Sequence, residues 1–226
     1  MFFFDPTYLL MLPGLLLGLW AQAKVQSAFH RYSAIPTRRG VSASLAVAQL
    51  LSRYGAGDVA IQRTRGHLTD HYDPKANVLR LSEGVYDSAS IAALGIAAHE
   101  AGHALQQRDH YPLLALRSRI VPLVNIGSYL SWPIFLGGII FSWTPLMLAG
   151  IILFSLVVLF TLITLPVEFN ASCRAREMLL AEGYLNQEEE KGVARVLNAA
   201  AMTYVASFVG AALQLLRLLI LARNRD

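Results

Sequence analysis

Cysteine and charge are both scarce in this sequence. Cys173 is the one cysteine among 226 residues, which excludes an intrachain disulfide and a zinc site made of several cysteines. Charged residues make up 15% of the chain, whereas soluble domains average about 25%. Apolar residues reach 55%, and a chain with that much apolar surface does not stay disordered in water. These proportions favour a membrane protein.

The sequence also lacks the features of a nucleic-acid-binding protein. Its net charge is +4, and it contains no nucleic-acid-binding motif and no platform of aromatic and basic residues. In a membrane protein, basic residues instead report which segments face the cytoplasm. We therefore expect the lipid bilayer, and no nucleic acid, as a partner.

Three apolar runs approach the length of about 20 residues that a bilayer requires. They span residues 7–23, 120–141 and 145–167. Only three residues separate the second run from the third, which predicts an antiparallel hairpin with Trp143 at the membrane interface. A fourth segment, residues 199–222, is apolar but contains Gln214 and Arg217, so it either crosses the membrane or lies in its interface.

The first apolar run could be a cleaved signal peptide or an uncleaved anchor. Residues 21–23 resemble a cleavage site. However, Asp5 precedes the run and Lys24 is the first basic residue, whereas a signal peptide begins with basic residues. We therefore expect an uncleaved anchor with its N-terminus outside.

Basic residues are concentrated between the apolar runs. Of the 19 Lys and Arg residues, twelve fall in residues 24–119 and four in residues 168–198, while residues 1–8 and 142–144 contain none. Because Lys and Arg are enriched on the cytoplasmic side, both basic segments are expected to face the cytoplasm. This pattern predicts a multi-pass integral membrane protein with both basic segments on the cytoplasmic side.

Short-range patterns predict the elements between the spans. Apolar residues three and four positions apart predict one helix over residues 42–54 and a second over residues 88–107. Three β-prone runs separated by turn signals predict a small β-meander. These runs are residues 59–63, 67–72 and 78–81. Asn186 and Glu189 form a capping-box pattern, which predicts a helix start.

The second of these helices carries His99, Glu100 and His103, in the pattern His-Glu-x-x-His. Histidines four residues apart lie on one helical face about one turn apart, so both imidazoles can bind one Zn²⁺. Glu100 can reach a zinc-bound water without binding the metal, and there it can act as a general base. Polar groups on an otherwise apolar helix are costly when buried without a partner. We therefore predict a catalytic zinc site rather than a chance cluster on a solvent face.

A catalytic zinc has three protein ligands and one open position, so the helix lacks one ligand. Asp109 is one option, but Gln106 stands where a metzincin-like site requires glycine. Glu168 is the other option, because a carboxylate directly after an apolar run is costly without a partner such as zinc. We favour Glu168 and keep Asp109 as the alternative.

Three stretches carry a family resemblance. They are residues 66–74 (Gly-His-Leu-Thr-Asp-His-Tyr-Asp-Pro), 97–104 (Ala-Ala-His-Glu-Ala-Gly-His-Ala) and 165–172 (Leu-Pro-Val-Glu-Phe-Asn-Ala-Ser). Through them the chain resembles the YugP-type membrane-embedded neutral zinc metallopeptidases, in the gluzincin group that also includes the HtpX proteases. The resemblance implies zinc-dependent peptide hydrolysis with one zinc per chain, and it assigns the third ligand to Glu168. Those relatives have Asp at the position of Ser172, so Ser172 or Asn170 is expected to steady a histidine ligand in its place.

Two further sets of residues are candidates for contact with the substrate or the ligands. His71 and Asp73 either stabilise the oxyanion and orient a ligand, or shape the turn before Pro74. The strand at residues 78–81 is expected to bind the substrate backbone along a free edge. Its residues are Val78, Leu79, Arg80 and Leu81.

These features predict a mainly α membrane protein (α+β), with three to four transmembrane helices and a small gluzincin-like catalytic domain carrying a short β-meander and a zinc helix. The expected segments are an anchor (1–23), a catalytic domain (24–119), a transmembrane hairpin (120–167), a third-ligand segment (168–198) and a transmembrane or interfacial helix (199–226). The expected function is a membrane-anchored zinc endopeptidase acting on membrane or membrane-proximal proteins. The alternative is a catalytically silent zinc-binding scaffold, although such a protein has no use for a general base at Glu100.

Overall fold

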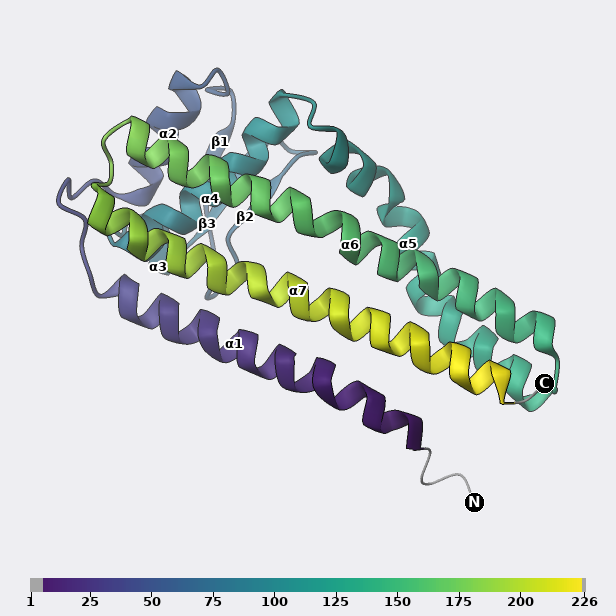
Figure 1. Cartoon of the computed structure of the whole chain (residues 1–226). Coiled ribbons are helices and arrows are strands. Elements are labelled where there is room, and N and C mark those ends of the chain that lie inside the picture. The colour runs from purple at the N-terminus through teal and green to yellow at the C-terminus, as the bar shows by residue number, and fades with distance from the viewer. Residues whose placement is uncertain (1–5, 225–226) are drawn as a thin grey trace. The chain divides into compact units, whose positions relative to one another are not determined.

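A computed structural model describes residues 6–224 of the chain, which are mainly helical with one small sheet, as predicted (Figure 1). The helices in chain order are η1 (Pro6–Met11), α1 (Leu12–Ser33), α2 (Ala43–Arg53), α3 (Glu83–Tyr86), α4 (Ile91–Arg108), α5 (Pro112–Ile140), α6 (Thr144–Ala181) and α7 (Gln187–Arg223). The strands are β1 (Ala60–Thr64), β2 (His71–Asp73) and β3 (Val78–Ser82).

Four helical stretches in the described chain are long and apolar enough to cross a membrane: η1 with α1, α5, α6 and α7. Residues 199–222, for which the sequence left two options, belong to one continuous helix, α7. The predicted hairpin is formed by α5 and α6, whose backbones approach closely. A Cβ added at Gly150 of α6 would lie 2.8 Å from the backbone nitrogen of Phe135 of α5.

The chain divides into two compact units. One contains the segment ending at Gln22, the segment Ala115–Pro166 and the segment beginning at Met202. The other consists of Ala23–Leu114 and Val167–Ala201. Every residue that the sequence suggested for metal binding, catalysis or substrate contact belongs to the second unit.

The sheet in this second unit is not a meander, so that prediction is wrong. β1 pairs with β3 in parallel and β2 pairs with β3 antiparallel, which gives the order β1-β3-β2. β3 takes the central place because it is the most apolar strand, with Leu79 and Leu81 fully buried. β1 and β2 are partly exposed and form the two edges.

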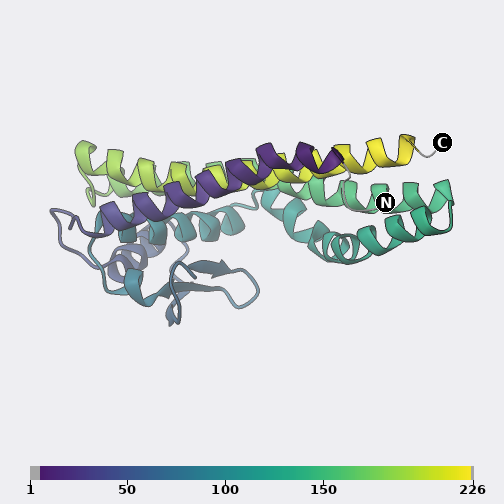
Figure 2. The same ribbon diagram turned by 90° about the horizontal axis from the view of Figure 1, so that it is seen from below.

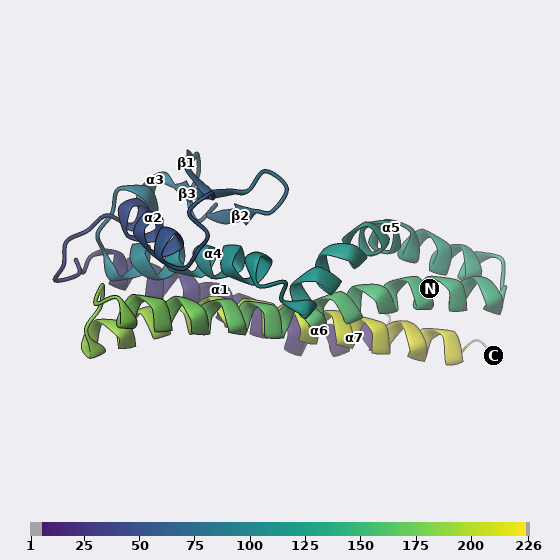
Figure 3. The ribbon, with the colours of Figure 1, turned by 90° about the horizontal axis from the view of Figure 1, so that it is seen from above.

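Helix α4 is the central element of the second unit. Ser90 caps it by accepting a hydrogen bond from the backbone N–H of Ala93, so the helix begins at Ile91. Figures 2 and 3 show the sheet on one side of α4 and the second-unit segments of α6 and α7 on the other. The alanine-rich sequence of α4 permits close packing on both sides.

One glycine of α4 permits the closest of these contacts. A Cβ added at Gly102 would lie 2.7 Å from the carbonyl oxygen of Ala171 in α6. Any side chain at this position would therefore push the two helices apart. This approach brings the motif of α4 against the part of α6 that begins at Val167.

Helix α7 begins with the predicted capping box. The Asn186 side chain accepts hydrogen bonds from the backbone N–H groups of Glu188 and Glu189. In return, the Glu189 carboxylate accepts one from the Asn186 N–H at 2.9 Å. The acidic residues at this helix start are therefore explained by capping and by the helix dipole.

Candidate metal centre

Three side chains from α4 and α6 converge in the second unit. His99 and His103 lie one turn apart on α4, and Glu168 lies on α6, with one ligand atom of each within 4.8 Å of the others. The Oε2 atom of Glu168 is 3.2 Å from Nε2 of His99 and 3.5 Å from Nε2 of His103. The side chains are 14%, 12% and 3% exposed, in the order His99, His103, Glu168. The structure therefore brings together the three residues that the sequence suggested as ligands.

The ring of His103 is held from its outer side by Gln106. Nδ1 of His103 lies 2.9 Å from Oε1 of Gln106. Because an amide oxygen only accepts hydrogen bonds, Nδ1 must carry the proton and donate it. The Nε2 atom of the neutral ring then has a free electron pair directed at Glu168.

The ring of His99 has a different outer partner. Its Nδ1 atom lies 3.1 Å from the hydroxyl oxygen of Ser172, which follows Glu168 by one helical turn on α6. A hydroxyl can accept the Nδ1 proton, which again leaves Nε2 facing Glu168. Ser172 is therefore placed to steady a histidine ligand, as the sequence predicts.

The donor set fits a zinc ion. Two imidazole nitrogens with free electron pairs and one buried carboxylate face a common point, and such acceptors repel one another unless a cation lies between them. Nitrogen and carboxylate oxygen ligands in a set of three are those of catalytic zinc sites. The hydrogen-bonded outer nitrogens also match the arrangement usual for histidines that bind metals.

Glu100 lies on α4 beside the two histidines, and β2 holds it. One of its oxygens, Oε2, accepts a hydrogen bond from the backbone N–H of Tyr72 at 3.0 Å. Within residues 6–224 the structure shows no such bond to Oε1. Burial raises the pKa of the Glu100 carboxyl above its usual range, and the neighbouring His99 and His103 partly oppose this shift. Glu100 thus has one oxygen anchored and one available to accept a proton.

The prediction that residues 78–81 bind the substrate along a free edge is wrong. Val78, Leu79, Arg80 and Leu81 belong to β3, which has a paired strand on each side and therefore offers no free edge. The strand that reaches Glu100 is β2, at the edge of the sheet. The sequence predicts a free edge at residues 78–81, but the buried Leu79 and Leu81 place this strand in the middle of the sheet.

His71 and Asp73 contact Arg80 on the sheet. The Arg80 guanidinium donates to Asp73 at 2.9 Å and lies 3.4 Å from Nε2 of His71. This hydrogen bond from Arg80 is the main reason that the pKa of Asp73 is lowered. Asp73 also accepts hydrogen bonds from the backbone N–H groups of Lys75 and Ala76. These contacts favour the turn-forming role over a role in the metal site.

Asp109, the alternative third ligand, is occupied elsewhere. Its carboxylate forms ion pairs with Arg108 and Arg174, each at 2.5 Å. The Arg174 and Arg108 guanidinium groups hold the pKa of Asp109 below its usual range. Among the described residues, the cluster able to hold a metal consists of His99, His103 and Glu168 and does not include Asp109.

Sequence reasoning missed the role of Gln106. In the sequence, Gln106 stands out only because a metzincin-like site requires glycine at its position. It lies three positions after His103, a spacing that puts two side chains on the same face of a helix. That spacing alone indicates that the Gln106 side chain can contact the ring of His103. Asn170, by contrast, was anticipated near the ligands, and it contacts Gln106 rather than a histidine.

Comparisons with known proteins also indicate a zinc enzyme. Residues 7–223 match the family described as "Putative neutral zinc metallopeptidase". The chain belongs to this zinc metallopeptidase family. It is also 46% identical over 215 residues to the "Putative membrane protease YugP" of Bacillus subtilis (strain 168), covering 95% of this chain and 96% of that protein. No solved structure matches the chain. Zinc is accordingly the cofactor of this metallopeptidase, and its four long apolar helices fit a membrane protein.

Proposed function

We propose that this metallopeptidase is a membrane-anchored zinc endopeptidase in which Glu100 is the general base. One observation carries the proposal: Glu100 adjoins the three candidate ligands, and one of its oxygens is fixed by the Tyr72 N–H at 3.0 Å. The anchored carboxylate is the element that a purely structural zinc site does not need. One zinc per chain is expected, held by His99, His103 and Glu168.

The chemistry divides between the metal and the protein. Zinc, when bound, supplies a Lewis acid that polarises a peptide carbonyl and makes water more acidic. Glu100 accepts the proton of the attacking water at Oε1 and passes it to the leaving amine. Such proton transfer typically contributes about 10²–10⁴-fold to a rate. Ser172 and Gln106 keep the histidine rings in the orientation that exposes Nε2.

A catalytically silent scaffold is the competing proposal. It accounts for the buried ligands but gives no reason for Glu100. Burial raises the pKa of the Glu100 carboxyl, and a carboxylate perturbed in this way beside a metal site is typical of a catalytic acid or base. The endopeptidase proposal therefore explains both the buried ligands and Glu100, whereas the scaffold proposal explains only the ligands.

We further propose that the site faces the cytoplasm of a bacterial cell membrane. Sixteen of the 19 Lys and Arg residues lie in residues 24–119 and 168–198, and the positive-inside rule places such segments in the cytoplasm. Substrates are then peptides or membrane-associated proteins with extended, accessible segments near the cytoplasmic surface.

The direct test uses the full chain purified in detergent. We expect it to cleave an unfolded, dye-quenched protein substrate, to lose this activity after zinc is removed with a chelator, and to regain it when zinc is restored. Hydrolysis that persists after complete zinc removal would exclude the proposed mechanism. Comparing membrane proteomes of cells with the wild-type chain and with Glu100→Gln would then identify the substrates.

A further inference from the structure

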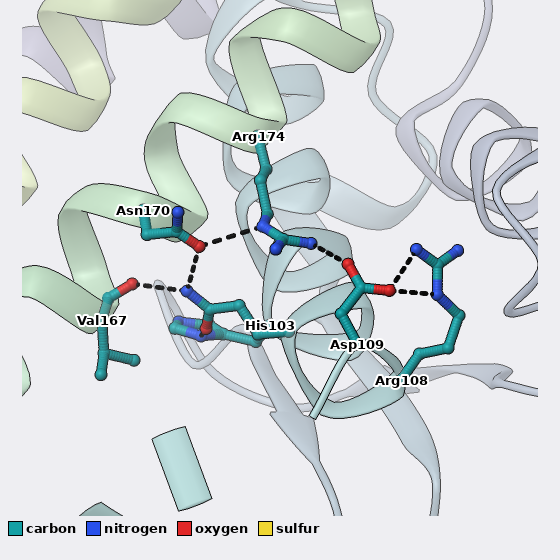
Figure 4. Close-up of polar contacts among 7 residues, drawn as sticks. His103, Arg108, Asp109, Val167, Asn170 and Arg174 are labelled. Carbon is teal, nitrogen blue, oxygen red and sulfur yellow. Dashed lines mark hydrogen bonds and ion pairs between the residues drawn. The ribbon is translucent and has the colours of Figure 1, made fainter. Parts of the chain in front are cut away.

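Gln106 is an amide side chain buried inside the second unit with all its polar groups in use. It is 0% exposed. Its Oε1 atom faces Nδ1 of His103 at 2.9 Å, while Nε2 donates to the carbonyl of Val167 at 2.8 Å and to Oδ1 of Asn170 at 2.9 Å (Figure 4). A buried polar group is stable only with such partners, so these bonds fix the position of the amide.

The orientation of this amide is dictated by α6. The backbone carbonyl of Val167 can only accept a hydrogen bond, so Nε2 of Gln106 must face α6. The Oε1 atom must then face His103. The orientation of a side chain on α4 thus depends on a backbone atom that directly precedes Glu168 in α6.

Arg174 reinforces this arrangement from the next turn of α6. It donates from Nε to the same Oδ1 atom of Asn170 at 3.0 Å, and because a guanidinium only donates, Asn170 must present its oxygen. Asp109 holds Arg174 in turn by an ion pair at 2.5 Å. A continuous set of hydrogen bonds therefore runs from His103 through Gln106, Asn170 and Arg174 to Asp109. Figure 4 shows its outer part, from Asn170 to Asp109.

We infer that Gln106 is a positioning residue for zinc binding. It fixes the proton of His103 on Nδ1, and it ties the helix of the two histidines to the backbone beside the third ligand, Glu168. The inference rests on the proposed metal site but adds a determinant of its affinity. Removing such an outer partner typically lowers metal affinity about 10–100-fold.

The primary test compares Gln106→Leu with Gln107→Leu in the full chain. Gln107 is an exposed glutamine on the same helix, so it controls for loss of an amide from α4. Zinc affinity is measured by competition with a chromophoric chelator, and Co²⁺ replaces zinc for a visible spectrum that reports ligand geometry. We expect Gln106→Leu to bind zinc about 10–100-fold more weakly with an altered Co²⁺ spectrum, and Gln107→Leu to match wild type.

A second pair of variants covers the case in which Gln106→Leu does not fold. Asn170→Asp keeps an oxygen for Nε2 of Gln106, whereas Asn170→Ala removes it. We expect Asn170→Ala to bind zinc more weakly than Asn170→Asp. A folded Gln106→Leu protein with wild-type zinc affinity would overturn the inference. If that variant is unfolded, equal affinities of Asn170→Ala and Asn170→Asp would do so. Failure of the endopeptidase proposal would look different, since wild type itself would then bind zinc but not cleave.

Discussion

At the scale of single residues, the two histidines of the site are held by partners of different chemistry. Gln106 presents an atom that can only accept, so it determines which nitrogen of His103 carries the proton. Ser172 presents a hydroxyl that can donate or accept, and it accepts the Nδ1 proton of His99 when Nε2 is to bind the metal. The hydroxyl of Ser172 does this without adding a buried negative charge beside the ligands.

The third ligand can be tested by the same measurement in two variants. Glu168→Ala should lose zinc to a chelator far more readily than wild type, because it removes one of three protein ligands. Asp109→Ala should retain zinc, because Asp109 pairs with Arg108 and Arg174 outside the cluster. Zinc content after dialysis against graded chelator measures both. The opposite order of the two variants would favour a site in which Asp109 is the ligand.

At the scale of the elements, the contact between α4 and α6 decides whether the ligands meet. Gly102 should not tolerate a side chain, because a Cβ there would lie 2.7 Å from the Ala171 carbonyl oxygen. Gly102→Ala should cost about 1–3 kcal/mol of stability, as expected for overpacking, and should weaken zinc binding.

Gly84→Ala is the matched control for this substitution. Its added Cβ has no described atom within 4 Å, so stability and zinc binding should stay near wild type. Thermal unfolding and zinc content of both purified proteins provide the comparison. A Gly102→Ala protein as stable and as well metallated as Gly84→Ala would contradict the close packing of these helices.

The elements also show what the sequence could and could not predict. The start of α7 follows from Asn186 and Glu189, which interact within one turn, and the histidines of α4 share a face because of helix geometry. The role of Glu168 as a ligand could be predicted because a carboxylate beside an apolar run needs a partner. The strand order β1-β3-β2 could not be predicted, because strand pairing depends on residues far apart in the sequence.

At the scale of the whole molecule, membrane orientation is the feature with the most consequences for substrates. If the four long apolar helical stretches all cross the membrane in the proposed orientation, with the N-terminus outside, residues 24–119 and 168–198 face the cytoplasm. The same arrangement carries Arg223, at the end of α7, to the outside, against the charge rule. The sixteen basic residues of the two segments should outweigh it.

Two topology reporters test this arrangement. A reporter inserted near Gly57, in the exposed connection between α2 and β1, should be active in the cytoplasm. A reporter fused after Asp226 should be active outside. Activity of the Gly57 reporter only on the extracytoplasmic side would invert the topology and exclude cytoplasmic substrates.

Zinc content and peptide hydrolysis of the Glu100→Gln protein, determined on one preparation, test the proposed role of Glu100 most directly. Glutamine has the shape of glutamate but cannot accept the proton, and Glu100 is not among the three residues that could hold the metal. We predict wild-type zinc content with hydrolysis reduced by about 10²–10⁴-fold. A folded Glu100→Gln protein that has lost its zinc, or that still cleaves at the wild-type rate, would contradict the assignment of Glu100 as the general base.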